Sequence, residues 1–457
     1  MCKEYAPELK RTLLYAVLED SAIPNIQILD RLLIYTTDLS YNNFVVQQNC
    51  YTRIEMLINR VGPPVRGADL FGRDRFVNLL WRRLEAGHVL LAAPRRFGKT
   101  SVMYRLIDEP RSGYKIVHAD LEALDSPEDF LLEIVVQLSA DSKIGRALEG
   151  IAGIPKRAWH GIRNAVDEVE LFQTKLKLRE HIAPDWQEIG RQVFKKIGQL
   201  DQPVLFILDE LPMMIDRMAR TENKREDAKT FLRWMRALRV SPDFKNVRFL
   251  IAGSIGIDAV LIEIGEISAI NDFEKLKLEP FTNDVARNLL TELARSEEIA
   301  LSEPCKDRMI ELIGIQVPYF LQILFSEVYK AHQATDEPIS VAGIDRIYRD
   351  KVLGVDCKTY FEHYYGRLRD YYSPQDERAV KRLLRELAKV GSMTPDACHA
   401  LYRATIGGSA NAESFNATLA NLENDFYIRL NTETDQYEFA CKLLRDWWLR
   451  HHGLEVR

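Results

Sequence analysis

The sequence predicts an α/β fold in which a parallel sheet is covered by helices on both faces. Four short apolar runs, separated by helical stretches, support this prediction: they lie at 88–93, 115–119, 204–208 and 248–253. Parallel strands that are buried on both faces read as continuous apolar runs. A chain of 457 residues also exceeds what one hydrophobic core usually serves. We therefore expect several domains arranged around one sheet.

Breaks in the pattern divide the chain into four predicted domains. A helical N-terminal segment is indicated by Leu9, Leu13, Val17 and Leu18, which recur at helical spacing before Gly62-Pro63-Pro64 interrupts the pattern. The predicted domains are 1–62, a helical N-terminal segment; 63–280, the core that holds the sheet; 281–352, a helical lid; and 353–457, a winged-helix-like domain. In the last domain we expect helices at 377–390, 394–404 and 411–423, followed by a hairpin at 426–439.

Composition excludes several classes of protein. Nothing approaches eighteen consecutive apolar residues, so no transmembrane helix is expected, and no signal peptide is indicated. Six cysteines without a CxxC pair argue against a zinc site or a disulfide framework and favour a cytoplasmic protein. A net charge of -5 gives no global attraction to nucleic acid, although a local basic patch remains possible.

The segment from Ala93 to Thr100 fits the pattern of a phosphate-binding P-loop. It reads Ala93, Pro94, Arg95, Arg96, Phe97, Gly98, Lys99, Thr100, and it follows an apolar run and precedes a helical stretch that starts at Ser101. Backbone N–H groups of such a loop point at phosphates, and the dipole of the following helix favours negative charge. We expect Lys99 to reach the β- and γ-phosphates of ATP and the Thr100 hydroxyl to bind Mg²⁺.

Two carboxylates follow the apolar run at 204–208. A buried parallel strand delivers Asp209 to the carboxyl edge of the sheet, where open α/β sheets bind their ligands. We expect Asp209 to hold Mg²⁺ and Glu210 to polarise the water that attacks ATP. Both carboxylates can ionise there because the metal's charge offsets their repulsion.

Two further residues are candidates for a catalytic role. Ser254 ends the run at 248–253 and is placed to sense the γ-phosphate; the alternative is a plain Gly-Ser turn. Arg233, Arg236 and Arg239 recur on one predicted helix, and Arg239 or Arg236 is a candidate arginine finger across a subunit interface. Three arginines at this spacing also describe an ordinary exposed helix face.

Together these motifs resemble those of the archaeal-type ATPases, within the wider AAA+ and STAND group of P-loop proteins. The resemblance covers about 66–350 and rests on five segments: Phe71-Gly72-Arg73-Asp74, Pro94-Arg95-Arg96, Leu208-Asp209-Glu210-Leu211-Pro212, Gly253-Ser254 and Pro318-Tyr319-Phe320-Leu321-Gln322. It implies that Gly72, Arg73 and Pro318 also contact the nucleotide. The chain departs from the family at Gln316, where a glycine is common, and in lacking a lid arginine.

The resemblance implies an ATP-binding and ATP-hydrolysing switch that controls oligomer assembly or the binding of a protein effector. The alternatives are a DNA-binding or DNA-remodelling ATPase that uses the winged helix, and a non-catalytic nucleotide-binding scaffold. Residues 411–423, the expected recognition helix, contain two glutamates and no lysine or arginine. Phosphate contacts supply most non-specific affinity for DNA, so this helix disfavours the DNA alternative.

Overall fold

The computed structural model describes residues 56–457, with gaps at 112, 165–167, 254–255, 408–411 and 457. Residues Glu55–Arg457 group into one compact unit. The N-terminal helices predicted before residue 56, and Ser254, lie outside the described residues. In the part that is described, no helix combines the length and the apolar character that crossing a membrane requires. The domain boundaries given above stay predictions.

A five-stranded parallel sheet forms the centre of the core, with the strand order β2-β3-β4-β1-β5. Its strands are β1 (His88–Ala92), β2 (Lys115–Asp120), β3 (Val204–Asp209), β4 (Val247–Gly253) and β5 (Phe273–Lys277). Four of them match the predicted apolar runs. The fifth, β5, was not predicted because it is an edge strand with Glu274, Lys275 and Lys277 exposed or half-buried, and so lacks an apolar run.

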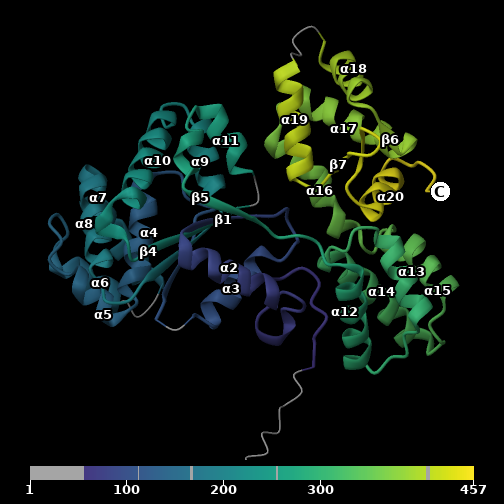
Figure 1. Cartoon of the computed structure of the whole chain (residues 1–457), viewed down its shortest axis with the longest axis horizontal. Helices are drawn as coiled ribbons and strands as arrows, with labels where there is room; N and C mark the ends of the chain where they lie inside the picture. The colour runs from purple at the N-terminus through teal and green to yellow at the C-terminus, as the bar shows by residue number, and fades with distance from the viewer. Residues whose placement is uncertain (1–55, 112, 165–167, 254–255, 408–411, 457) are drawn as a thin grey trace, which may run out of the picture. The chain divides into compact units, whose positions relative to one another are not determined.

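Helices cover both faces of this sheet, because successive residues of each strand point to opposite sides. Val89 and Leu91 of β1 belong to one hydrophobic cluster, whereas Leu90 belongs to the other. The first cluster includes α2 (Asp74–Ala86) and α3 (Lys99–Asp108). The second includes α4 (Pro127–Ser139), α8 (Trp186–Gly198), α9 (Leu211–Arg220), α10 (Arg225–Val240) and α11 (Ile257–Ile264). Figure 1 shows these two helical layers around β1 and β4.

An insertion lies between α4 and α8, which explains the long separation of Lys99 from Asp209. It consists of α5 (Ser142–Leu148), α6 (Lys156–Asn164) and α7 (Glu168–Ile182). Its Trp159 is fully buried and joins the second cluster. The indole therefore anchors this insertion to the core.

The lid follows β5 as a set of helices. They are α12 (Asn283–Ser296), α13 (Glu303–Ile313), α14 (Pro318–Thr335), α15 (Val341–Ile347) and a π-helical turn at Tyr348–Val352. Gln316 holds the start of α14 in place: its carbonyl accepts from Phe281 N at 2.9 Å, and its side-chain amide donates to the carbonyl groups of Ile310 and Gly314. The glutamine thus has a structural role where the family often has glycine.

The C-terminal region has the element order expected of a winged helix. After α16 (Lys358–Tyr371) come α17 (Pro374–Val390), β6 (Ser392–Met393), α18 (Pro395–Ile406), α19 (Ala412–Asn424), β7 (Ile428–Asn431), β8 (Gln436–Phe439) and α20 (Lys442–His451). The three strands form one antiparallel sheet. The predicted fold class, a P-loop NTPase sheet with a helical lid and further helical segments, is confirmed for the described residues.

We predict that Gly72→Ala lowers the free energy of unfolding by about 1–3 kcal/mol, measured by urea denaturation. Gly72 has φ +67°, and an added Cβ would lie 2.6 Å from Val285 Cγ1. Gly366→Ala is the matched control, because this glycine lies within α16 and a Cβ there meets nothing within 4 Å. The control should keep or raise stability, by up to about 1 kcal/mol. Equal stability of the two variants would show that position 72 does not require glycine.

Candidate nucleotide-binding site

The P-loop takes the backbone shape that phosphate binding requires. It leaves β1 at Ala92 and enters α3 at Lys99. Two residues take left-handed conformations, Arg96 at φ 71° and Gly98 at φ 93°. Such a succession of turns directs backbone N–H groups into one concave nest, and the N-terminus of α3 adds its positive dipole. The loop predicted at 93–100 is therefore set up to hold an anion.

A cavity of about 400 Å³ opens beside this loop. Its volume lies within the range of nucleotide-sized ligand sites. Ten of the predicted contact residues line it: Arg73, Pro94, Arg95, Arg96, Phe97, Gly98, Lys99, Thr100, Ser101 and Pro318. Glu210 also lines it, whereas Ala93, Gly72 and Asp209 do not. The structure thus brings the core, the P-loop and the lid together around one cavity.

Lys99 is the central cation of the site. Its side chain is buried, and its ammonium donates to the carbonyl oxygen of Gly253 at the end of β4. Burial lowers the pKa of Lys99 to about 8, against the opposing effect of the Glu210 and Asp209 carboxylates. The predicted phosphate-binding lysine therefore lies at the carboxyl edge of the sheet, next to both predicted carboxylates.

Asp209 and Glu210 occupy the end of β3 and the turn that follows. Asp209 is nearly fully buried, and its Oδ1 accepts from the Glu210 backbone N–H at 3.0 Å. Glu210 has φ 55° and precedes α9. Burial, together with the neighbouring Glu210 and Asp120 carboxylates, raises the pKa of Asp209 to about 6, against the opposing effect of Lys99. Asp120 pairs in register with Asp209 across β2 and β3.

This set of donors fits a divalent cation. Carboxylates and hydroxyls are the ligands that Mg²⁺ prefers, and it usually shares them with phosphates and water. The pKa of Asp209 is raised first by burial and then by repulsion from Glu210 and Asp120, and a cation bound at the carboxylate would offset both effects. Asp209 and the Thr100 hydroxyl are the residues that would hold it. Among the described residues, no cluster of three or more histidine, cysteine or acidic groups forms a complete metal site.

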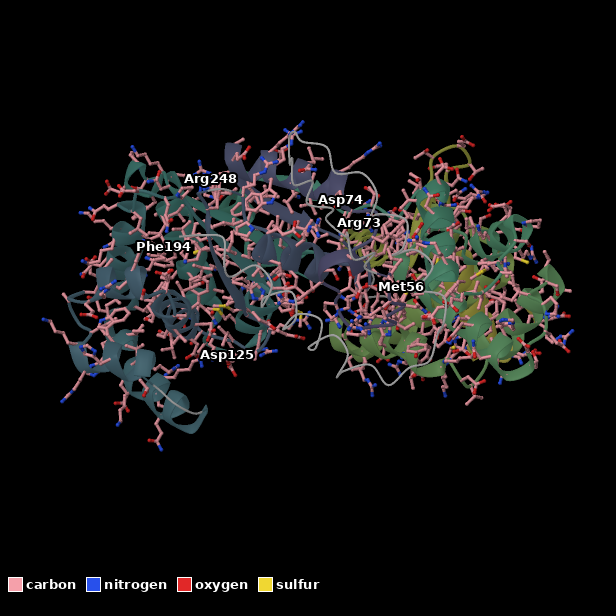
Figure 2. The ribbon with its side chains drawn as sticks, turned by 90° about the horizontal axis from the view of Figure 1, so that it is seen from below. Met56, Arg73, Asp74, Asp125, Phe194 and Arg248 are labelled. Carbon is pink, nitrogen blue, oxygen red and sulfur yellow. The ribbon has the colours of Figure 1, made fainter. Side chains whose placement is uncertain are left out.

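Arg73 ties the P-loop to the hinge of the lid. One of its guanidinium nitrogens donates to the Phe97 carbonyl at 3.2 Å, and another donates to the Glu279 carbonyl at 2.7 Å. The guanidinium also lies 4.4 Å from the ring centroid of Phe281. Burial lowers the pKa of Arg73 to about 10. Figure 2 labels Arg73 at the start of α2. Its role is to position the loop as well as to line the cavity.

The linker before the core forms one wall of the cavity, which the sequence did not predict. Gly62, Pro63, Pro64 and Val65 all line the cavity. Arg96 donates to the Gly62 carbonyl at 3.1 Å and lies 4.7 Å from the ring centroid of Tyr319 in the lid. The Val65 backbone N–H donates to Ser101 Oγ at 3.0 Å. Linker, P-loop and lid are thus joined by direct contacts at the cavity.

The C-terminal domain also reaches the P-loop. Phe426 takes a left-handed conformation, with φ 65°, in the turn after α19, and its ring meets Phe97 edge to face at 4.9 Å between centroids. The preceding Asp425 is buried and forms an ion pair with Arg367 of α16 at 3.4 Å. Arg367 lies close enough to lower the pKa of Lys99. The turn at the end of the expected recognition helix therefore packs on the P-loop.

His363 of α16 is a second contribution of this region. It lines the cavity. Burial, and after it the positive charges of Arg96, Arg95 and Arg367, lower the pKa of His363 to about 4. The sequence did not single out His363 as a site residue, because a lone histidine carries no signal of its own. Asp120 could have been predicted from the sequence as a neighbour of Asp209, because both residues end apolar runs that were expected to form parallel strands.

The structure does not place the two remaining candidates, Ser254 and Arg239, at the cavity. Ser254 lies outside the described residues, although Gly253 before it bonds to Lys99. Arg239 pairs with Asp272 at 2.7 Å, and its guanidinium lies 4.6 Å from the ring centroid of Phe273. It is not among the residues that line the cavity. These contacts give Arg239 a structural role within the subunit, and its role as a finger stays a prediction. Arg236 on the same helix is exposed.

Comparisons with known proteins agree with this fold. The chain matches no protein-family model and no curated protein sequence. Among solved structures it is similar to a Walker-type ATPase of Pyrococcus abyssi, at 16% identity and a TM-score of 0.56, over 85% of this chain and 99% of that chain. It is also similar to the ORC2 protein of Aeropyrum pernix, at 11% identity and a TM-score of 0.47, over 86% of this chain and 97% of that chain.

A third similar structure is the RuvB Holliday junction branch migration motor of Thermotoga maritima, at 12% identity and a TM-score of 0.39, over 85% of this chain and 97% of that chain. Identities this low bear on the fold and not on the activity. The strand order β2-β3-β4-β1-β5, the P-loop after β1 and the structural similarity to the Pyrococcus ATPase agree. The chain therefore has the fold of the P-loop NTPases.

Proposed function

We propose that this protein is a magnesium-dependent ATPase that works as a switch, in which the C-terminal domain responds to the nucleotide bound at the P-loop. One observation carries the proposal. The buried Lys99 ammonium lies beside Asp209 and Glu210, at the mouth of a cavity that the P-loop lines. A phosphate chain bound there would meet one buried cation and an open nest of N–H groups. Its metal ion would meet the carboxylates.

Each residue has a definite task in this mechanism. The P-loop N–H groups and Lys99 bind and orient the phosphates. Thr100 and Asp209 would hold Mg²⁺, which would supply positive charge against the phosphate oxygens. Glu210 accepts a hydrogen bond from the attacking water and aligns it with the γ-phosphorus. Pro318 and Tyr319 of the lid, with the linker at 62–65, enclose the rest of the nucleotide and exclude water.

Contacts of the C-terminal domain support the switch. Phe426 packs on Phe97, and the Arg367–Asp425 pair lies within electrostatic range of Lys99. A ligand moves an equilibrium only by binding two states with different affinity. Phosphates at Lys99 would interact directly with these groups, so docked and undocked states of the domain would differ in nucleotide affinity. The released surface would then bind a second copy of the chain or a protein effector.

Replacing Lys99 with methionine should abolish stabilisation of the protein by MgATP, because the site loses the buried cation of the P-loop. The measurement is the shift in melting temperature with added MgATP, since a ligand that binds only the folded state stabilises it. Lys195→Met, at an exposed position of α8, is the control and should keep the full shift. A normal shift in the Lys99 variant would show that nucleotide binds elsewhere.

Glu210→Gln should bind MgATP as tightly as the parent protein and hydrolyse it about a hundred- to ten-thousand-fold more slowly. The carboxylate of Glu210 acts on water in the transition state, so its loss lowers the rate without lowering ground-state affinity. Asp209→Asn should instead weaken the binding of ATP in the presence of Mg²⁺, because Asp209 is proposed to hold the metal ion. The two variants are compared by nucleotide titration and by phosphate release. Unchanged phosphate release in the Glu210 variant would move the water-activating role to another carboxylate, of which Glu122 lines the same cavity.

Phe426→Ala should speed nucleotide release about two- to tenfold, because an edge-to-face aromatic pair is worth about 0.5–1.5 kcal/mol. Phe415→Ala is the control: this ring packs on Tyr402 and His399 within the C-terminal domain. The control should lower the stability of that domain but leave release unchanged. Release is followed with a fluorescent ATP analogue. Equal release rates in the parent protein and the Phe426 variant would show that packing of the C-terminal domain on the P-loop does not affect nucleotide binding.

A further inference from the structure

A row of four cations runs along one face of α17, the first helix of the winged-helix-like domain. The row consists of Arg378, Arg382, Arg385 and Lys389, all of them exposed. At about 100° per residue they fall within an arc of about 60°, and they extend over about 16 Å of helix. The residues of α17 that are buried lie on the opposite side: Ala379, Val380, Leu383, Leu384, Leu387 and Ala388. We name the four cations the α17 row.

Internal ion pairing does not account for the α17 row. Among the described residues, no carboxylate forms an ion pair with Arg378, Arg382 or Arg385. Within the part of the chain that the structure describes, Arg382 donates one hydrogen bond, to Thr405 Oγ1 at 3.3 Å. Lys389 pairs with Glu386 at 2.8 Å, and that pair is solvent-exposed enough to contribute little. An exposed helix face usually mixes both signs of charge, whereas this one is positive in a chain of net charge -5.

The positive charge continues onto the neighbouring α20. Arg450 at its end is exposed. The pKa of His452 just beyond it is lowered by burial first, and then by positive groups around it, which include Arg385 and Lys389. The side chain of Arg445 donates to the Ala388 carbonyl at 2.9 Å and holds the two helices together. The α17 row therefore belongs to a rigid, packed surface and not to a loop.

We propose that the α17 row binds the phosphate backbone of a nucleic acid without reading its sequence. Interfaces between proteins are built around buried apolar and aromatic residues, and the row itself contains none. Evenly spaced arginines and lysines on a helix instead match a line of phosphates, whose neutralisation releases counterions. The expected recognition helix does not serve this purpose, because 411–423 lacks cations and the turn that follows packs on the P-loop. The surface is thus separate from the proposed ATP site.

The test measures the binding of a fluorescently labelled duplex DNA of about 30 base pairs by anisotropy, between about 50 and 200 mM salt. Neutralising four phosphate contacts predicts a slope of log affinity against log salt of about −3 to −4. The variant Arg378→Gln, Arg382→Gln, Arg385→Gln, Lys389→Gln should bring the slope near zero and weaken binding at the lower salt at least about a hundredfold. Single-stranded DNA and duplex RNA, tested alongside, establish which phosphate backbone binds most tightly.

The matched control removes the same charge elsewhere, as Arg75→Gln, Arg82→Gln, Lys195→Gln, Lys245→Gln, all at exposed positions outside the domain. It should bind like the parent protein. The proposal is overturned if both fourfold variants lose affinity equally, or if the parent protein shows no salt-dependent binding to any of the three nucleic acids. It is also overturned if polyglutamate competes as well as DNA at equal charge, since the partner is then an acidic protein. The MgATP shift in melting temperature should be normal in both variants, which separates this test from that of the ATPase.

Discussion

The structure around the site depends on the burial of one charge, the ammonium of Lys99. A buried ammonium is strongly unfavourable unless it is paired and hydrogen-bonded. Here the Gly253 carbonyl accepts its hydrogen bond, and Glu210 and Asp209 supply negative charge. Lys99 follows β1, whereas its partners lie at the ends of two other strands, β3 and β4, so all three strands must be in place before the charge can be accommodated. Gly253 also has to be a glycine, because a Cβ there would lie 2.5 Å from Pro212.

The same arrangement leaves negative charge that the protein itself does not balance. Burial, Glu210 and Asp120 together raise the pKa of Asp209, even with Lys99 close by. A buried carboxylate with a raised pKa, such as that of Asp209, lowers the stability of the folded protein. A bound cation would restore that stability. A bound cation would offset the carboxylates and bound phosphates would pair with Lys99, so each would favour the binding of the other. In the proposed switch, this coupling would let a nucleotide alter the contacts of neighbouring domains.

Three segments outside the P-loop contact it and would transmit such a change in the proposed switch. The linker reaches it through Arg96 and Gly62, and the lid hinge through Arg73 and Glu279. The C-terminal domain reaches it through Phe426. That domain also carries the α17 row on an exposed face. The surface proposed to bind phosphates and the contact proposed to sense nucleotide thus belong to one domain, so a change in docking would also move the cations relative to the core.

By itself the sequence determined what local patterns encode: four strands, the P-loop, the carboxylates after β3, and the helices and hairpin of the last domain. Strand β5 escaped prediction because an edge strand is charged on its exposed side. Asp120, His363, the linker wall and the turn at Phe426 were decided only by the tertiary structure. Each becomes part of the site through a neighbour remote in sequence, as when β2 pairs with β3 or α16 packs beside the P-loop. Local periodicity records which face of an element is buried, but it carries no information on which distant element buries it.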